Sequence, residues 1–173
     1  MTAYVALLRG VNLVGKSSLK MADLKAIADE LKLEKARTYI ASGNLLFLSG
    51  RDEEKLRQML EKRMQAHMGK EVRVMLRTAA EMEAVVQANP FTEQAGNRVQ
   101  VFFLNAPPPK DLIETVRGQA DDERIAAGAR EVFVAYGEKG IGKSRLRIPA
   151  AEAGTARNMN TVAKLAELAR EMS

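Results

Sequence analysis

Two segments near the ends of the chain place hydrogen-bond donors where an apolar pattern stops. In residues 7–16, LLRGVNLVGK, the apolar run ends at an Arg-Gly pair, and residues 155–165, TARNMNTVAKL, lead into an expected closing helix. Guanidinium, ammonium and amide groups beside free backbone N–H groups can together bind an anion. The candidate ligand-binding residues of these segments are Arg9, Asn12, Lys16, Arg157, Asn158 and Asn160.

The same residue types also have ordinary structural uses. Asn158, Asn160 or Thr161 could each be the N-cap of the closing helix, which is worth about 1 kcal/mol. Arg9 could simply pair with a carboxylate, and the neighbouring glycines could only shape a turn. The sequence leaves both interpretations open for these segments.

A third candidate is the loop at residues 137–144, GEKGIGKS, which matches the phosphate-loop pattern G-x-x-x-x-G-K-S after an expected strand. A working phosphate loop needs a sustained helix after it, whereas Pro149 leaves barely one turn. We therefore interpret the loop as an anion-binding or solvated basic turn rather than a nucleotide-hydrolysing site. Its candidate contacts are Lys143, Ser144 and Arg145.

The residue inventory excludes several catalytic classes. Because the chain has no cysteine, it has no disulfide, no thiolate nucleophile and no cysteine-ligated zinc. His67 is the single histidine, so a His-ligated metal site or a Ser-His triad is hard to assemble. The acidic run at 121–123 is more typical of a solvated turn than of a metal site. The sequence predicts no metal and no cofactor, and it identifies no catalytic residue.

Composition and charge describe a foldable basic protein. The 173 residues are 46% apolar, which is enough to bury a core, and the net charge of +5 favours anionic partners. No apolar run approaches the roughly 20 residues of a membrane helix, and the N-terminal residues lack the layout of a signal peptide. We expect a cytoplasmic protein without membrane association. Its candidate partners are a phosphate-bearing ligand or nucleic acid.

Apolar spacing in the first half predicts the order strand, helix, strand, strand, helix, strand. Residues 2–8 read as a buried strand, and residues 21–32 and 52–68 as amphipathic helices, the second ended by Gly69. Residues 41–44, ASGN, predict a hairpin turn between two short strands. This order is that of a ferredoxin-like half, in which both helices cover one face of an antiparallel sheet.

The rest of the chain predicts a connector and a related second half. Thr78 and Glu81 form a capping-box pair that opens a short helix. Residues 99–104, VQVFFL, are the strongest strand signal, and a helix with Leu112 and Val116 should follow before two more strands and the closing helix. No residue-level repeat links the halves. The fold prediction is α+β, with two ferredoxin-like βαββα-type halves at 1–77 and 99–173 and a connector helix at 78–98.

A family resemblance supports this organisation. LLRGVNLVGK, TYIASGNLLF at residues 38–47 and TARNMNTVAKL occur in this order and span nearly the whole chain, and together they resemble the bacterial domain-of-unknown-function 1697 family. The resemblance implies a small cytoplasmic bacterial protein with two related α+β halves. That family has no established activity, so the resemblance transfers no catalytic residue.

Three functional hypotheses remain. We rank binding of a phosphate-bearing ligand, a nucleotide or nucleic acid, above a phosphate-chemistry enzyme that uses Lys143 of the GEKGIGKS loop. A protein-interaction module comes third. We also expect the end segments to converge on one basic site with the Lys143 loop at its rim. The residues that would face each other there are Arg9, Asn12 and Lys16 on one side and Arg157, Asn158 and Asn160 on the other.

Overall fold

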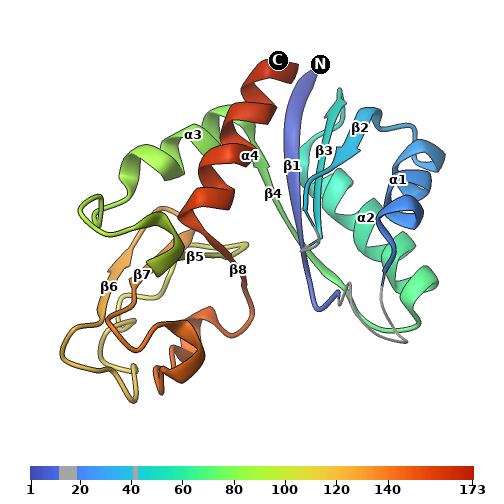
Figure 1. The fold of residues 1–173 in the computed structure, drawn as a ribbon. Coiled ribbons are helices and arrows are strands. Elements are labelled where there is room, and N and C mark those ends of the chain that lie inside the picture. Colours follow the sequence, from blue (N-terminus) through green and yellow to red (C-terminus); the bar gives the residue numbers. More distant parts are fainter. Residues whose placement is uncertain (12–18, 41–42) are drawn as a thin grey trace. The chain divides into compact units, whose positions relative to one another are not determined.

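A computed structural model describes residues 1–11, 19–40 and 43–173, which form two four-stranded antiparallel sheets and four α-helices (Figure 1). The predicted α+β fold with two ferredoxin-like halves is confirmed. By compactness the chain divides into a first unit, Met1–Glu83 with Leu165–Ser173, and a second unit, Ala84–Lys164. The predicted boundaries followed element order instead, and that division stays a prediction. No helix in the described ranges has the length and apolar character needed to cross a membrane.

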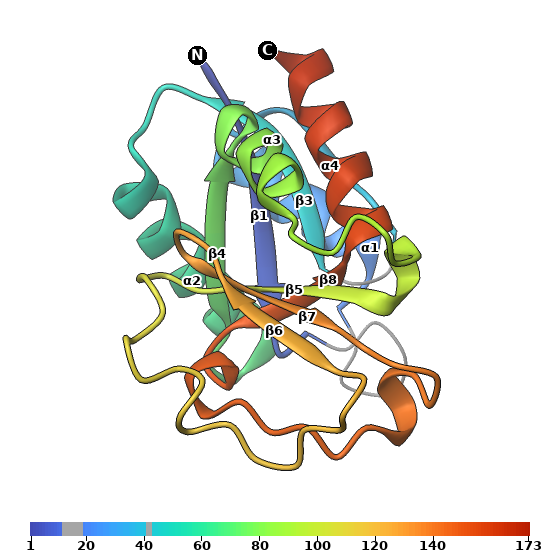
Figure 2. The ribbon, with the colours of Figure 1, turned by 90° about the vertical axis from the view of Figure 1, so that its left-hand side faces the viewer.

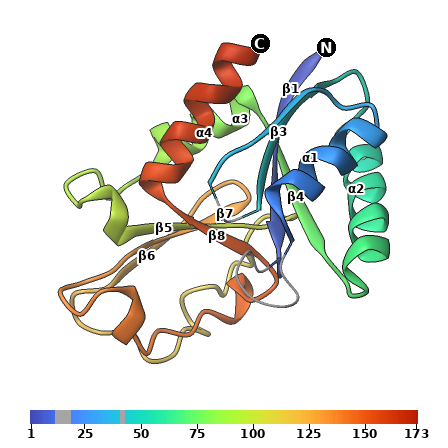
Figure 3. The same cartoon turned by 45° about the vertical axis from the view of Figure 1, so that its right-hand side comes forward.

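The first sheet has the strand order β2-β3-β1-β4, in which every neighbouring pair is antiparallel. Helices α1 and α2 both lie on one face of this sheet (Figure 1, Figure 3), as the sequence predicts. The elements are β1 Thr2–Arg9, α1 Met21–Glu30, β2 Glu34–Thr38, β3 Asn44–Ser49, α2 Glu53–Met68 and β4 Arg73–Thr78.

Helical spacing of apolar residues explains how these two helices pack. Leu56, Leu60 and Met64 of α2 recur every four residues and are completely buried, so they present one stripe to the sheet. The N-terminus of α2 is capped by Asp52, whose carboxylate accepts a hydrogen bond from the backbone N–H of Lys55 at 2.8 Å. Gly69 ends α2 in the left-handed conformation, at φ 70°. The predicted end of this helix is therefore confirmed.

The second sheet repeats the topology of the first. Its strand order is β6-β7-β5-β8, so in both sheets the first strand of the half lies between the third and the fourth. Both faces of β7 are buried, as they are for β3, its counterpart in the first sheet. The remaining elements are α3 Ala79–Ala88, β5 Val99–Phe103, β6 Arg124–Ala127, β7 Glu131–Ala135, β8 Thr155–Asn158 and α4 Met159–Met172.

The predicted helix with Leu112 and Val116 is wrong, because this segment forms turns. The backbone N–H groups of Leu112 and Val116 donate to carbonyls three residues earlier. The Thr115 hydroxyl donates to the Leu112 carbonyl at 3.1 Å. Three prolines precede the segment, and Ile113 is 56% exposed, so no buried stripe stabilises a longer helix. The stretch between β7 and β8 contains two short 3-10 turns. Figure 2 shows the yellow and orange loops gathered on one side of β5, β6 and β7.

Strand β8 also corrects the sequence analysis, because Arg157 lies in this strand rather than at a helix start. Its position matches that of Arg77 in β4: Arg77 pairs with Val5 of β1, and Arg157 with Val101 of β5. Each arginine is buried and donates to the carbonyl of the residue before it, at 2.9 and 2.8 Å. The structure thus reveals a residue-level repeat that the sequence analysis missed.

The residue after each of these arginines caps the helix that follows. The Thr78 hydroxyl accepts from the Glu81 N–H at 3.1 Å while the Glu81 carboxylate accepts from the Thr78 N–H at 2.9 Å, which confirms the predicted capping box. The Asn158 side chain accepts from the Thr161 N–H at 2.9 Å at the start of α4. The structure therefore confirms the capping role for Asn158.

Loss of the Thr78 cap should measurably weaken the protein. We expect Thr78→Ala to lower the free energy of unfolding by about 1 kcal/mol, because the Glu81 N–H loses its acceptor. Urea unfolding followed by circular dichroism measures the change. Thr78→Ser keeps the hydroxyl and is the matched control, which should stay within about 0.5 kcal/mol of the unmodified protein. An equal loss in both variants would show that the threonine methyl group, not the cap, stabilises this position.

Candidate functional site

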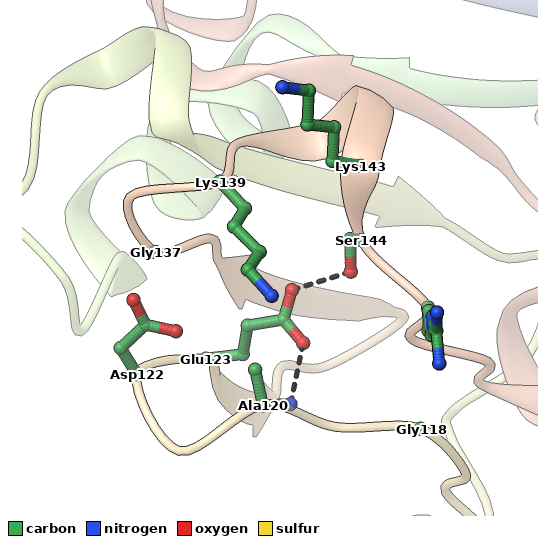
Figure 4. A pocket seen from close by; sticks show the side chains of 9 residues that line it. Gly118, Ala120, Asp122, Glu123, Gly137, Lys139, Lys143 and Ser144 are labelled. Atoms are coloured by element: carbon green, nitrogen blue, oxygen red, sulfur yellow. Dashed lines mark hydrogen bonds between the residues drawn. The ribbon is translucent and has the colours of Figure 1, made fainter.

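Loops at one end of the β6–β7 pair line an open pocket of about 400 Å³, which we call the basic pocket (Figure 4). Two chain segments line it, one within residues 118–123 before β6 and one within residues 137–145 after β7. Its volume lies in the range of small-molecule sites, roughly 300 to 1,000 Å³. The pocket therefore has room for a compact ligand, and its two segments directly precede β6 and follow β7.

Glu123 joins the two segments at the floor of the pocket. It is only 6% exposed, and one carboxylate oxygen accepts from the Ala120 N–H at 2.9 Å. The other oxygen accepts from the Ser144 hydroxyl, whose oxygen in turn accepts from the Leu146 N–H at 3.1 Å (Figure 4). The expectation of a solvated acidic turn is wrong for Glu123, because these hydrogen bonds hold it inside the loop layer.

Asp122 ties the same two segments together at a second point. Its carboxylate accepts from the backbone N–H of Glu138 at 3.1 Å. Gly137 approaches this carboxylate so closely that an added Cβ would lie 1.9 Å from the carboxyl carbon. A side chain at this position would push the Asp122 carboxylate out of place, so Gly137 allows the close approach.

Three cationic side chains line the basic pocket together with these acids, and none of the three has an ion-pair partner among the described residues. Lys139, Lys143 and Arg145 line the basic pocket, are exposed, and form no ion pair within the described part of the chain. Figure 4 shows the Lys139 ammonium extending toward Glu123, whereas Lys143 points away from it. The Lys139 ammonium therefore faces a carboxylate that already accepts hydrogen bonds from the protein, and Lys143 and Arg145 add positive charge to the pocket lining.

The geometry of the GEKGIGKS segment differs from that of a phosphate loop. The segment forms a turn and a 3-10 helix, Ile141–Lys143, and the chain leaves Ser144 in an extended conformation. A phosphate loop instead opens a sustained helix whose N-terminus faces the phosphate. The Ser144 hydroxyl, which would hold Mg²⁺ in such a loop, donates to Glu123. The pattern match is present in the sequence without the matching structure.

The C-terminal candidates occupy ordinary structural positions. Arg157 is 6% exposed and donates to the Thr155 hydroxyl at 2.7 Å and to the Ala156 carbonyl. Burial lowers the pKa of Arg157 to about 10, so the guanidinium stays protonated at neutral pH. Asn160 is exposed, and its amide oxygen lies against Gly96. None of the three is among the described residues that line the basic pocket.

Of the three N-terminal candidates, the structure describes only Arg9. Arg9 is the exposed last residue of β1. Asn12 and Lys16 lie outside the described residues, as does Ser42 of the expected hairpin turn. Arg9 belongs to the first unit and Arg157 to the second, so their convergence on one site stays a prediction. The residues that the structure does bring together are Lys143, Ser144 and Arg145.

No metal centre is apparent in the described ranges, where no three His, Asp or Glu side chains are grouped to hold an ion. The chemistry that the basic pocket offers is therefore hydrogen bonding and charge: ammonium and guanidinium donors above a fixed, internally bonded floor.

Comparison with known proteins identifies a matching family and a similar structure. The family model described as "Protein of unknown function (DUF1697)" matches residues 1–133. A conserved bacterial protein from Streptococcus pneumoniae, SP0830, has a similar structure, with a TM-score of 0.76 and 24% sequence identity over 98% of this chain and 99% of that chain. At this identity the likeness supports a shared fold. Among curated proteins, no match to the sequence was found.

Proposed function

Since the chain belongs to the DUF1697 family of proteins of unknown function, its role has to be inferred from the site, and we propose that the basic pocket binds a compact phosphate-bearing ligand. The ligand is held by Lys139 and Arg145, and Lys143 adds positive charge to the lining of the pocket. The observation that carries this proposal is a difference between the acidic and basic side chains of the pocket. The two carboxylates accept hydrogen bonds from the protein, whereas the cationic side chains form no ion pair among the described residues.

The acids of the pocket have internal roles that account for their presence. Glu123 holds the Ala120 N–H and the Ser144 hydroxyl, and Asp122 holds the Glu138 N–H. A carboxylate that accepts such bonds fixes the geometry of the loops. The oxygens that accept them are occupied by donors of the protein, so they are poorly placed to bind a cationic ligand. The lysines and Arg145 have no comparable role among the described residues, so their free donors face solvent at the pocket.

A phosphate group matches these donors in charge and geometry. Phosphate accepts several charge-assisted hydrogen bonds at once, and arginine presents a planar pair of donors that suits it. The net charge of +5 adds long-range attraction for an anion. The donors also sit on loops supported by a sheet, the usual arrangement for binding residues.

Phosphoryl transfer is less well supported by the same geometry. The Ser144 hydroxyl already donates to Glu123, Lys143 points away from that carboxylate (Figure 4), and no α-helix begins within residues 137–148 to polarise the phosphate. A pocket of about 400 Å³ without an aromatic residue in its described lining also suits a compact ligand better than a nucleic-acid strand, which needs an extended groove with stacking side chains. Binding without hydrolysis is the simpler reading.

The test is calorimetric titration of pyrophosphate and of a short single-stranded oligonucleotide into the full chain. We expect pyrophosphate to bind, and Lys139→Ala and Arg145→Ala each to weaken it about tenfold, because a lost hydrogen bond to a charged group is worth about 1.5 to 3 kcal/mol. Both side chains are exposed, so the melting temperature should change little.

Lys110→Ala is the matched control for these variants. Lys110 is exposed, belongs to the same unit, and is absent from the described lining of the basic pocket, yet its loss changes the net charge equally. Pyrophosphate affinity should survive this substitution. If Lys110→Ala weakens binding as much as Lys139→Ala does, the interaction is non-specific charge attraction, and the proposed site is wrong. An oligonucleotide that binds while pyrophosphate does not would point to a nucleic-acid surface instead.

A further inference from the structure

A single β-bridge joins the two loop segments of the second unit near the basic pocket. In this bridge the backbone N–H groups of Arg117 and Arg147 each donate to the carbonyl of the other residue, at 2.9 and 2.7 Å. The Cα atoms of such a hydrogen-bonded antiparallel pair lie about 5.5 Å apart, and the two side chains share one face. The bridge therefore holds two arginines side by side.

The burial of the neighbouring residues shows which face the arginines occupy. Leu146 and Ile148 flank Arg147 and belong to the apolar cluster of the second unit or pack against it. Val116, which precedes Arg117, packs against the same cluster. Successive side chains of an extended chain point to opposite sides, so the arginines project away from the apolar cluster. Both arginines are exposed, which agrees with this direction.

Arg145 connects this pair to the basic pocket. The chain is extended at Ser144 and at Ile148, so Arg145 lies on the same exposed side as Arg147, two residues further on. Arg145 also lines the basic pocket, and its carbonyl oxygen would lie 2.2 Å from a Cβ at Gly118. The two segments therefore touch at this point as well as at the bridge. We call Arg117, Arg145 and Arg147 the arginine cluster.

The charge of the arginine cluster is not neutralised within the described part of the chain, where none of its members forms an ion pair. One nitrogen of Arg117 donates to the carbonyls of Glu114 and Val116, at 3.5 and 3.2 Å, and the other nitrogens of this guanidinium keep their N–H groups. Like charges directly opposite each other in a ladder are destabilising. An anion that bridges Arg117 and Arg147 would remove this repulsion.

We propose that the ligand is a linear polyphosphate longer than pyrophosphate, with one end at Lys139 in the basic pocket and its further phosphates along the arginine cluster. This inference rests on the proposed function and adds the ligand class. Residues 139–147 carry four cations and no acid, and Arg145 belongs to both the pocket and the cluster. Guanidinium groups bind phosphate oxygens through paired hydrogen bonds, so a row of arginines suits a row of phosphates. Inorganic polyphosphate and the 5′-triphosphate of a nucleotide share this chemistry.

The test is calorimetric titration of pyrophosphate, tripolyphosphate and adenosine triphosphate into the full chain in magnesium-free buffer. We expect tripolyphosphate to bind about tenfold more tightly than pyrophosphate, because its additional phosphate gains charge-assisted hydrogen bonds from the arginine cluster. An affinity for adenosine triphosphate at or below that for tripolyphosphate assigns the inorganic chain as the source. A higher affinity for adenosine triphosphate assigns the nucleotide.

Substitutions of Arg147 separate the arginine cluster from the basic pocket. In Arg147→Ala the preference for tripolyphosphate should fall from about tenfold to about twofold, while pyrophosphate affinity stays unchanged. The bridge is made by backbone groups, so this variant keeps it. Arg147→Glu places opposite charges across the bridge, and its melting temperature should be at or above that of the unmodified protein while the preference for tripolyphosphate is lost. Lys110→Ala is the charge-matched control for Arg147→Ala and should keep the full preference.

The outcomes distinguish the two proposals. If neither pyrophosphate nor tripolyphosphate binds, the proposed function fails and this inference fails with it. If pyrophosphate binds but tripolyphosphate has no advantage, or if Arg147→Ala keeps the full advantage, the arginine cluster is not part of the site and only this inference is overturned. An advantage that Lys110→Ala reduces as much as Arg147→Ala does is general charge attraction, which also overturns it.

Discussion

Arg157→Ala should lower the free energy of unfolding by about 3 kcal/mol, one of the two largest effects that we expect. The guanidinium is buried, donates to the Thr155 hydroxyl and to the Ala156 carbonyl, and lies in the short strand β8 that pairs with β5. Truncation removes hydrogen bonds of a charged donor, each worth about 1.5 to 3 kcal/mol, and leaves a space where the side chain packs. Chemical denaturation followed by circular dichroism measures the loss.

Two companion variants make this result interpretable. Arg145→Ala removes the same charge from an exposed position and should stay within about 0.5 kcal/mol of the unmodified protein. Arg157→Met keeps most of the volume, so its loss should be smaller than that of alanine. If Arg157→Ala unfolds at the same denaturant concentration as Arg145→Ala, the buried arginine does not stabilise the second sheet.

The topology was predictable because its signals are local. The stripe of Leu56, Leu60 and Met64, the capping box at Thr78 and the stop at Gly69 each depend on residues within a few positions of one another. Such patterns fix where helices begin and end, and the alternation of strands and helices then restricts the topology to a few choices. The ferredoxin-like order of the first half follows from these signals.

The secondary-structure predictions failed at short segments, where only a few residues indicated a helix. Leu112 and Val116 have helical spacing, but only Leu112 of this segment is well buried, and the prolines before it limit helix length. Strand β8 has four residues, and Arg157 within it was predicted to lie at the start of the helix that follows. Contacts with distant parts of the chain determine the secondary structure of such short segments, and periodicity alone does not reveal those contacts.

The site was less predictable than the fold because its defining contacts are distant in sequence. Lys143, Ser144 and Arg145 were identified from a motif, yet the carboxylate that holds Ser144 is 21 residues away. Nothing in the sequence separates Glu123 from its two exposed acidic neighbours. Lys139 was recognised as part of a basic loop, but its place above Glu123 is a result of tertiary structure (Figure 4).

Comparison of the two halves explains why the second one holds the basic pocket. In the first half two helices cover one face of the sheet, and each buries an apolar stripe. In the second half the corresponding connections are turns and 3-10 segments, and the basic pocket lies between them. Loops that replace helices on the same scaffold gain freedom to position side chains. The second half is therefore the one we expect to bind.

Gly118→Ala should destabilise the protein as strongly as Arg157→Ala, by about 3 kcal/mol. Gly118 lines the basic pocket at φ +70°, a conformation that costs other residues about 1 to 2 kcal/mol. An added Cβ would also lie 2.2 Å from the carbonyl oxygen of Arg145, and a backbone atom cannot rotate away as a side chain can. Overpacking of this kind adds about 1 to 3 kcal/mol and should displace Arg145 from the pocket.

Two other glycines in the same loop layer separate conformational strain from steric clash. Gly140 has the same positive φ but open space around it, so Gly140→Ala should cost about 1 kcal/mol. Gly142 has neither constraint, and Gly142→Ala should stay within about 0.5 kcal/mol of the unmodified protein. Urea unfolding should rank the losses as Gly118, then Gly140, then Gly142, and pyrophosphate titration should show weakened binding for Gly118→Ala, in which Arg145 moves. Equal stability of the Gly118 and Gly142 variants would mean that the loop layer yields easily, and the fixed pocket on which the binding proposal depends would not exist.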